Sequence, residues 1–272
     1  MLKMLKSLIG LGLVLAFAFG TFGQMAVAEA ADLTVGAPPS LRPTFAEILP
    51  LFEREYGVSV QVVYTPSGTL SRQVENGTAI DVFLGAGMAE VERLHRKGLT
   101  LDGRPRVYAQ TSLVLVMSTD SPGILVSFDD ALPNRATRIA MGDPRVSSLG
   151  SITAQALTKV HPRYKDRSHL LYAPHSEDIM QLIHKGKADV GLVYRIDAIS
   201  STKIRISDES PIGEYLPVQF GHAIVSTCRE SSLSAAHAFS EFLMSSRIQK
   251  LLLKYGFEPI PASTQSLVSQ RN

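Results

Sequence analysis

The stretch "YTPSGTLSRQVENGTAIDVFLGA", residues 64–86, shows how this chain alternates between strand and helix. Residues 65–68 are turn and helix-capping types, an amphipathic run follows them, and Asn76 and Gly77 precede the apolar segment 82–84. The pattern predicts a strand, a tight turn, a helix, a loop and a second strand. Such a turn places a hydroxyl and a glycine where backbone N–H groups point outward, so it can cap a helix or hold an anion.

The same alternation runs through the rest of the chain. We predict strands at residues 33–37, 58–64, 81–86, 112–118, 138–143, 169–173, 188–194 and 222–227. We predict helices at residues 44–57, 68–77, 88–98, 151–160 and 177–186, and one or two helices at 234–256. This order indicates an α/β fold with mostly parallel sheets. The apolar segments 112–118 and 218–227 are candidate crossovers between two domains.

The first 30 residues have the pattern of a signal peptide. Lys3 and Lys6 form a basic start, residues 8–20 form an apolar core, and "AVAEA" (26–30) supplies cleavage patterns, so we predict cleavage near Ala30. The apolar core is shorter than the ~20 residues that span a membrane. No cysteine follows it, so a lipid-anchored start is not expected. An uncleaved N-terminal anchor is the alternative.

The remaining chain, about 240 residues, is long enough for one large domain or two ordinary ones. Without residues 1–30, the 27 basic and 25 acidic residues fall to 25 and 24, a formal charge of +1. This near-neutral balance gives no reason to expect nucleic acid as a partner. The lone cysteine, Cys228, cannot form an internal disulfide.

Four predicted strand-to-helix turns carry small hydroxylic residues. They are "GAPPSLRPTF" with Ser40, "YTPSGTL" with Ser67, "GDPRVSSLGS" with Ser147 and Ser148, and "APHSED" with Ser176. Any one of these serines can be a helix N-cap and nothing more, worth ~1 kcal/mol. In a parallel α/β sheet, however, such turns gather at one edge, where helix N-termini offer unpaired N–H groups. Together the turns predict an anion site that needs no lysine or arginine.

Enzyme motifs are weak in this sequence. It contains no G-x-S-x-G and no G-x-x-x-x-G-K-[ST], and "GAGMAE" (85–90) lacks the third glycine of a dinucleotide loop. "SSTK" (200–203) matches S-x-x-K but falls in a polar loop. The seven histidines do not pair at zinc-ligand spacing. "HSED" (175–178) stays open as a metal cluster or an acid–base pair, although its acids also suit the first turn of a helix.

In four of its segments the chain resembles the periplasmic molybdate-binding proteins that feed ABC transporters. The matching stretches are residues 39–86, 138–157, 177–198 and 239–257, in that order, within a resemblance that spans residues 32–258. The resemblance implies a two-lobed periplasmic binding protein with its ligand in the cleft between the lobes. We expect residues 31–109 and 219–272 to form lobe I and residues 110–218 to form lobe II, with closure about crossovers near 109–111 and 218–220.

The resemblance also implies the ligand-binding residues: Ser40, Ser67, Leu149, Ser176 and Tyr194. We expect Ser67 to cap its helix and to point its hydroxyl into the cleft. No cofactor and no separate metal site are expected, because these residues would bind the metal only as its oxyanion. Tyr194 has an alternative role as a core aromatic residue at the end of a strand.

Two of these positions depart from the family pattern. The family usually has Ala where this chain has Leu149, and an apolar residue such as Val where it has Ser176. Both positions act chiefly through their backbone N–H groups, so oxyanion binding is compatible with the changes. The family also tends to carry Arg where this chain has Glu177, and the "APPS" turn before Ser40 is more rigid than the usual "AAAS".

The resemblance therefore implies an exported receptor, not an enzyme, that delivers molybdate or tungstate to an ABC transporter permease in the periplasm and acts as a monomer. Sulfate or a phosphonate is the alternative ligand. A serine hydrolase, with His175 as the nearest candidate base, or an anion sensor is the alternative of another class. Because the expected contacts are nearly all donors, we also expect the site to reject phosphate, which carries a proton near pH 7.

Overall fold

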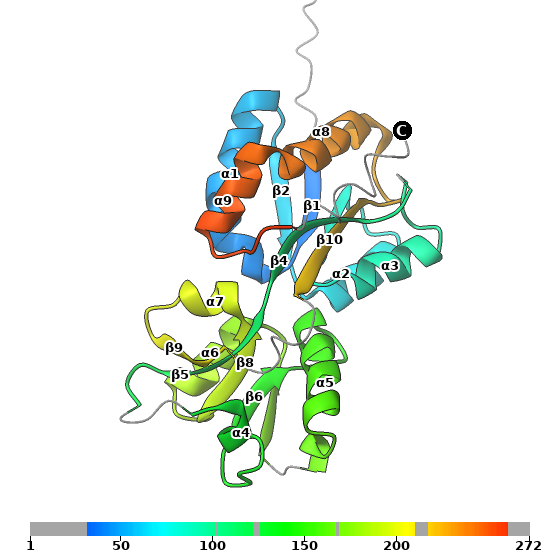
Figure 1. Ribbon diagram of the computed structural model, residues 1–272. Coiled ribbons are helices and arrows are strands. Elements are labelled where there is room, and N and C mark those ends of the chain that lie inside the picture. Colours follow the sequence, from blue (N-terminus) through cyan, green and yellow to red (C-terminus); the bar gives the residue numbers. More distant parts are fainter. Residues whose placement is uncertain (1–31, 102, 122–125, 167–168, 210–216, 261–272) are drawn as a thin grey trace, which may run out of the picture.

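The computed structural model describes residues 32–101, 103–121, 126–166, 169–209 and 217–260 (Figure 1). The predicted signal peptide, residues 1–30, lies outside the described residues. Two five-stranded sheets with helices packed around them confirm the α/β class and the two-lobed architecture. Among the described residues, none of the helices has the length and apolar character that a membrane crossing needs.

Lobe I is the first sheet with its helices. The sheet has the strand order β2-β1-β3-β10-β4. Its strands are β1 (Leu33–Ala37), β2 (Val60–Tyr64), β3 (Val82–Leu84), β4 (Arg106–Thr111) and β10 (Val218–Ile224). Its helices are the 3-10 turns η1 (Pro39–Leu41) and η4 (Glu230–Ser232) and the α-helices α1 (Arg42–Tyr56), α2 (Ser67–Glu75), α3 (Ala89–Arg96), α8 (Leu233–Met244) and α9 (Ser246–Lys254).

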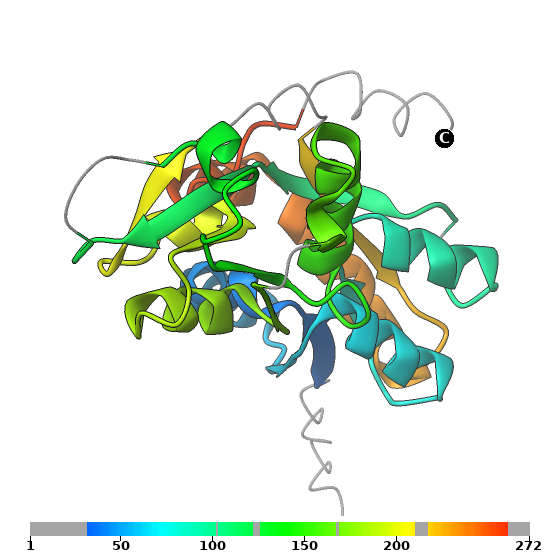
Figure 2. The ribbon, with the colours of Figure 1, turned by 90° about the horizontal axis from the view of Figure 1, so that it is seen from below.

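Lobe II is the second sheet with its helices. The sheet has the strand order β7-β6-β8-β5-β9. Its strands are β5 (Leu113–Ser118), β6 (Ile139–Gly142), β7 (Leu170–Ala173), β8 (Val190–Tyr194) and β9 (Ile204–Asp208). Its helices are α4 (Phe128–Ala131), α5 (Ser148–Val160), the 3-10 turn η2 (Tyr164–Asp166), α6 (Ser176–His184) and α7 (Arg195–Ile199). Figure 2 shows α5 and α6 on opposite faces of this sheet.

Each sheet combines parallel and antiparallel neighbours. The strands that alternate with helices pair in parallel: β1 with β2 and β3, and β6 with β7 and β8. The remaining pairs are antiparallel: β10 with β3 and β4, and β5 with β8 and β9. The carboxyl ends of the parallel strands in both lobes therefore carry the turns that the sequence singled out.

The two lobes are joined by an almost continuous strand. Only Ser112 separates β4 of lobe I from β5 of lobe II, and the two strands run across the molecule as one ribbon (Figure 1). The chain returns between β9 and β10 through residues 210–216, which lie outside the described residues. The expected division of the chain at 109/110 and 218/219 stays a prediction.

Lobe I has an apolar core on each face of its sheet. On one face, the rings of Phe45 and Phe52 of α1 pack edge-on against Phe239 of α8, with centroids 6.3 and 5.1 Å away. On the other face, α2 and α3 form a separate cluster with β3. Its members are Leu70, Val74, Ile80, Phe83, Val91, Leu94 and Val225. With both faces covered, the turns at the carboxyl edge of the sheet stay open to a ligand.

The side chain of Asp81 joins β1 to the segment that leads into η4 and α8. Its buried carboxylate accepts the backbone N–H groups of Thr34 at 2.7 Å and Arg229 at 3.0 Å, and an Arg229 Nη2 bond at 2.7 Å. Burial raises the pKa of Asp81, but the hydrogen bonds of Arg229 and the Thr34 N–H outweigh burial, and the net pKa is lowered. The ionised form is therefore the one that stabilises the fold.

We expect Asp81→Ala to lower the free energy of unfolding by roughly 3 kcal/mol, because it leaves buried donors without an acceptor. Asp189→Ala is the matched control: Asp189 pairs with Arg138 with both side chains over 40 % exposed, so the loss should stay below about 1 kcal/mol. Urea unfolding followed by circular dichroism measures both. The Asp81 contribution should be present at neutral pH and decline as the pH falls below 3.8, its ordinary pKa, toward the lowered pKa of the folded state. Equal losses in the two variants would contradict this assignment.

Candidate functional site

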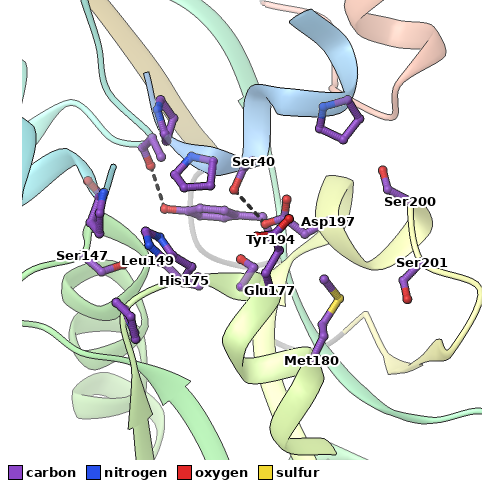
Figure 3. Close-up of a pocket in the computed structure, with 18 of the residues that line it drawn as sticks. Ser40, Ser147, Leu149, His175, Glu177, Met180, Tyr194, Asp197, Ser200 and Ser201 are labelled. Carbon is purple, nitrogen blue, oxygen red and sulfur yellow. Dashed lines mark hydrogen bonds between the residues drawn. The ribbon is translucent and has the colours of Figure 1, made fainter. Parts of the chain in front are cut away.

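A cleft of about 370 Å³ lies where turns of the two lobes face each other (Figure 3). It brings together all five residues expected to bind the ligand: Ser40, Ser67, Leu149, Ser176 and Tyr194. Its other lining residues are Pro38, Pro39, Pro43, Pro66, Ala86, Ser147, Ser148, Pro174, His175, Glu177, Met180, Asp197, Ser200, Ser201, Thr202 and Lys203. The predicted residues come from five different elements, so only the fold places them side by side.

Each predicted residue lies where a strand meets the following helix. Ser40 is in η1 after β1, and Ser67 opens α2 after β2. Leu149 is the second residue of α5 after β6, and Ser176 opens α6 after β7. Tyr194 is the last residue of β8. The carboxyl ends of the parallel strands thus set all five residues at the cleft, as expected for ligand sites in such sheets.

The expectation that Ser67 caps its helix is wrong. The N-cap of α2 is Pro66, and the N-cap of α6 is His175; neither makes a side-chain capping bond. Ser147 does cap α5, because its hydroxyl accepts the Gly150 N–H at 3.4 Å. No capping side chain therefore occupies the first N–H groups of α2 and α6. These groups lie at the helix ends that line the cleft, where they favour an anion.

Two glycines press the start of α5 against β6. A Cβ on Gly150 would lie 2.4 Å from the carbonyl carbon of Asp143, and a Cβ on Gly142 would lie 2.5 Å from the Gly150 nitrogen. Real Cβ atoms do not come this close to backbone, so both positions need glycine. This close contact fixes Leu149, whose side chain is buried, at the edge of the cleft.

The hydroxyl groups of the cleft are in different hydrogen-bonding states. Ser67 Oγ accepts the Ala86 N–H at 3.0 Å, which leaves its own proton free. The Tyr194 hydroxyl donates to the Ala86 carbonyl at 2.7 Å, and its buried ring packs edge-on against Phe220 at 5.2 Å. Tyr194 therefore serves both as a core aromatic and as part of the cleft wall. Burial raises its pKa well above the ordinary value, so the hydroxyl keeps its proton.

Ser40 and Ser176 differ from these two residues. Ser40 donates its proton to Asp197 Oδ2 at 2.9 Å. The buried hydroxyl of Ser176 has no hydrogen-bond partner among the described residues. A ligand oxygen in the cleft would therefore find unengaged protons on Ser67 and Ser176, whereas Ser40 would have to turn away from Asp197.

Asp197, in the first turn of α7, is the site residue that the sequence analysis missed. Its side chain is buried and lines the cleft beside the Tyr194 ring (Figure 3). Burial raises the pKa of Asp197 to about 6, the hydroxyls of Ser176 and Ser40 oppose the rise, and the charge of Glu177 adds to it. The expected set of contacts, nearly all donors, did not include this carboxylate, which is an acceptor.

Direct contacts join the lobes across the cleft. Besides the Ser40–Asp197 and Tyr194–Ala86 bonds, Ser148 Oγ of lobe II donates to the buried carboxylate of Glu90 in lobe I at 2.8 Å. The cleft is thus bounded by lobe I residues and lobe II residues that already touch. A ligand bound there would contact both lobes at once.

Two alternatives from the sequence find no support in these contacts. His175 lines the cleft, but Ser40 donates to Asp197 and Ser67 accepts from a backbone N–H, so neither serine is paired with this histidine. In the part of the chain that the structure describes, no cluster of three or more His, Cys, Asp or Glu residues could hold a metal ion, and this includes the segment 175–178.

The fold and the cleft define a two-lobed binding protein. Residues 33–258 match the family described as bacterial extracellular solute-binding proteins, and the chain belongs to that family. The description of this family names the binding of solutes.

Relatives and solved structures resemble this chain over most of its length. The chain is 28% identical to YvgL of Bacillus subtilis, whose name assigns it provisionally to the ABC transporter substrate-binding lipoproteins, over 83% of this chain and 85% of YvgL. It is 25% identical to the molybdate-binding protein ModA of Escherichia coli, over 89% and 94% of the two chains. The Azotobacter vinelandii periplasmic molybdate-binding protein superposes with a TM-score of 0.71 at 21% identity, over 84% of this chain and all of that one.

A sulfate-binding protein shares the fold equally well. SubI of Mycobacterium tuberculosis superposes with a TM-score of 0.70 at 20% identity, over 88% of this chain and 90% of SubI. At these identities the superpositions show the fold alone. The choice between oxyanions therefore depends on the cleft and not on overall similarity.

Proposed function

We propose that this protein captures a tetrahedral oxyanion, molybdate or tungstate, outside the cytoplasm and delivers it to the membrane permease of an ABC transporter. The observation that carries the proposal is the single cleft that collects Ser40 and Ser67 from lobe I with Leu149, Ser176 and Tyr194 from lobe II. The molybdate-binding relatives supply the class of ligand. No cofactor takes part in this function.

The chemistry of capture uses neutral donors. The free hydroxyl protons of Ser67 and Ser176 and the first N–H groups of α2, α5 and α6 would surround the oxyanion. Hydrogen bonds to a charged acceptor are stronger than neutral ones, and a cleft closed to water strengthens them further. Because donors come from both lobes, the bound ligand would favour the closed arrangement of the lobes.

Location and partners follow from the same proposal. The protein would be exported, cleaved near Ala30 and released as a monomer into the periplasm, where the permease is its only macromolecular partner. Mass spectrometry of the exported protein should show a chain that starts near Ala31. An intact Met1 on membrane-bound material would contradict cleavage.

A calorimetric titration of the anion-free protein tests the proposed function. Molybdate and tungstate, which are nearly the same size, should bind alike and more tightly than sulfate, because a smaller anion cannot reach donors of both lobes at once. Stronger binding of sulfate would keep the receptor class and change the ligand. Absence of binding by every oxyanion would refute the proposal, and turnover of an ester substrate would favour the hydrolase alternative.

Ser67→Ala should weaken oxyanion binding by roughly tenfold to a hundredfold, because it removes a hydrogen bond to a charged oxygen worth roughly 1.5–3 kcal/mol. Ser40→Ala should fall within the same range. Ser200→Ala is the matched control: Ser200 also lines the cleft, but its hydroxyl donates to the Ile196 carbonyl at 2.8 Å. The oxyanion affinity of Ser200→Ala should stay within about twofold of the native value. Native affinity in both cleft variants would remove these two serines from the site.

A further inference from the structure

Asp197 is a carboxylate inside a cleft that we assign to an anion. Its carboxylate oxygen Oδ2 lies 2.9 Å from Ser40 Oγ, one of the residues expected to contact the ligand, and only 9 % of the residue is exposed. Two like charges in one buried site disfavour each other strongly. An ionised Asp197 would therefore disfavour the anion that the proposed function places in this cleft.

The groups around Asp197 do not neutralise it. His175 and Glu177 face the cleft from the start of α6, Tyr194 from the end of β8, and Lys203 from the segment after α7. Glu177 is acidic, and Lys203 Nζ lies 3.3 Å from His184 Nε2 on α6. Among the described residues, no Lys, Arg or His side chain forms an ion pair with Asp197. The Ser40 hydroxyl donates to it, and the Ser176 hydroxyl lies near enough to oppose the rise of its pKa.

An oxyanion at Ser40 would change the balance at Asp197. Ser40 has one hydroxyl proton, which it now donates to Asp197, so donation to the ligand would take this hydrogen bond away from the carboxylate. An ionised Asp197 would then lose a donor at the moment when a dianion arrives beside it. A proton on Asp197 removes the repulsion and lets the carboxyl group donate a hydrogen bond of its own.

Resting on the proposed function, we propose that Asp197 determines the specificity of the cleft by binding one proton together with the oxyanion. With a fully deprotonated dianion, the proton comes from solvent and joins the Asp197 carboxylate. With an oxyanion that carries its own proton, the ligand O–H donates to the ionised carboxylate, and solvent supplies no proton. In both cases the loaded cleft holds one proton between ligand and protein, and no bond between heavy atoms forms or breaks.

The pKa of Asp197, raised by burial to about 6, supports this geometry. In the empty cleft the group is mostly ionised above about pH 7, and a bound dianion raises its proton affinity further. Affinity for a dianion should therefore fall as the pH rises above about 6, approaching tenfold per pH unit.

Calorimetry of the full mature chain tests the inference. Sulfate and molybdate are titrated at about pH 7.5 in two buffers whose ionisation enthalpies differ, which gives the number of protons exchanged. We expect uptake of about one proton with either anion. Phosphate, which carries its own proton at this pH, should show clearly lower uptake.

Asp197→Asn should abolish proton uptake and make dianion affinity independent of pH. It should also raise the ratio of sulfate to phosphate affinity by at least about tenfold near pH 8, because the amide gives the phosphate proton a weaker acceptor. Asp178→Asn is the control: this carboxylate is also in the first turn of α6 but does not line the cleft, and the variant should keep the uptake of one proton.

The outcomes separate the two proposals. If the native protein binds an oxyanion without proton uptake, or if Asp197→Asn keeps both the native pH profile and the native sulfate-to-phosphate ratio, the role of Asp197 is refuted and the proposed function stands. If no oxyanion binds at any pH, the proposed function itself fails.

Discussion

Gly68→Ala is expected to weaken oxyanion binding by about a hundredfold, close to 3 kcal/mol, while the protein folds normally. Gly68 is the second residue of α2 in lobe I, and a Cβ at this position would lie 2.8 Å from the carbonyl oxygen of Val146 in lobe II. The obstacle is backbone, which cannot rotate away as a side chain does. The lobes would have to separate to admit the methyl group, and overpacking of this kind costs roughly 1–3 kcal/mol.

The loss should appear in binding and not in folding. Alanine is a better helix former than glycine by about 1 kcal/mol, so α2 itself is not weakened. Small-angle scattering with saturating ligand should show compaction of the native protein and a smaller change in the variant. Thr69→Ala is the control on the same helix, because Thr69 Oγ1 only accepts an exposed bond from Arg72 at 3.1 Å. Native affinity together with native compaction in Gly68→Ala would contradict closure through this contact.

The sequence predicts most of the fold because the buried strands and the amphipathic helices have clear periodicity. Two strands were missed, β4 and β9, and each lies at the edge of its sheet. Their sequences, "RVYAQT" and "IRISD", carry charged and polar residues, as edge strands commonly do. Without a continuous apolar run, neither segment stands out from a loop.

The cleft was predicted in part. Ser40, Ser67, Leu149, Ser176 and Tyr194 do line one cleft, and the family resemblance identified them as a set. The sequence does not determine their exact positions on the helices. A serine after a proline can be the N-cap or the first helical residue, and Ser67 is the first residue of α2. One residue of difference decides whether a hydroxyl caps the helix or faces the ligand.

Asp197 shows what a sequence pattern cannot reveal. Locally it is an acid in the first turn of a helix, which is an ordinary position for Asp. Its chemistry comes from Ser40, 157 residues earlier in the chain, and from burial between the lobes. The available signal was its position three residues after the tyrosine that ends β8, on the turn that faces the cleft.

Asp197→Asn should also stabilise the anion-free protein, by roughly 3 kcal/mol at neutral pH. In the folded protein the pKa of Asp197 is raised by burial from 3.8 to about 6, and each unit corresponds to about 1.4 kcal/mol. The folded state therefore binds the proton more tightly than the unfolded chain, and native stability declines as the pH rises from 3.8 to about 6. Asparagine has no such titration.

The decisive measurement is how the difference in unfolding free energy between Asp197→Asn and the native protein changes with pH. In urea unfolding this difference should be smallest below pH 3.8, increase up to about pH 6 and stay constant above it. His222, whose pKa burial lowers to about 3, destabilises both proteins on acidification and cancels in the difference. Asp178→Asn should show no such increase. A difference that does not change with pH would mean that burial does not raise the pKa of Asp197 in the empty cleft.

The substitution leaves the local hydrogen bonds in place. An amide oxygen at position 197 can still accept the Ser40 proton, and the amide N–H can donate to the Ser176 hydroxyl, which has no partner among the described residues. The gain in stability and the loss of proton-coupled binding should therefore appear in the same variant, because both come from one buried charge. Such a charge destabilises the empty cleft, and a protonated Asp197 beside a bound oxyanion removes that destabilisation. Stability and ligand selection are thus opposed at this single carboxylate.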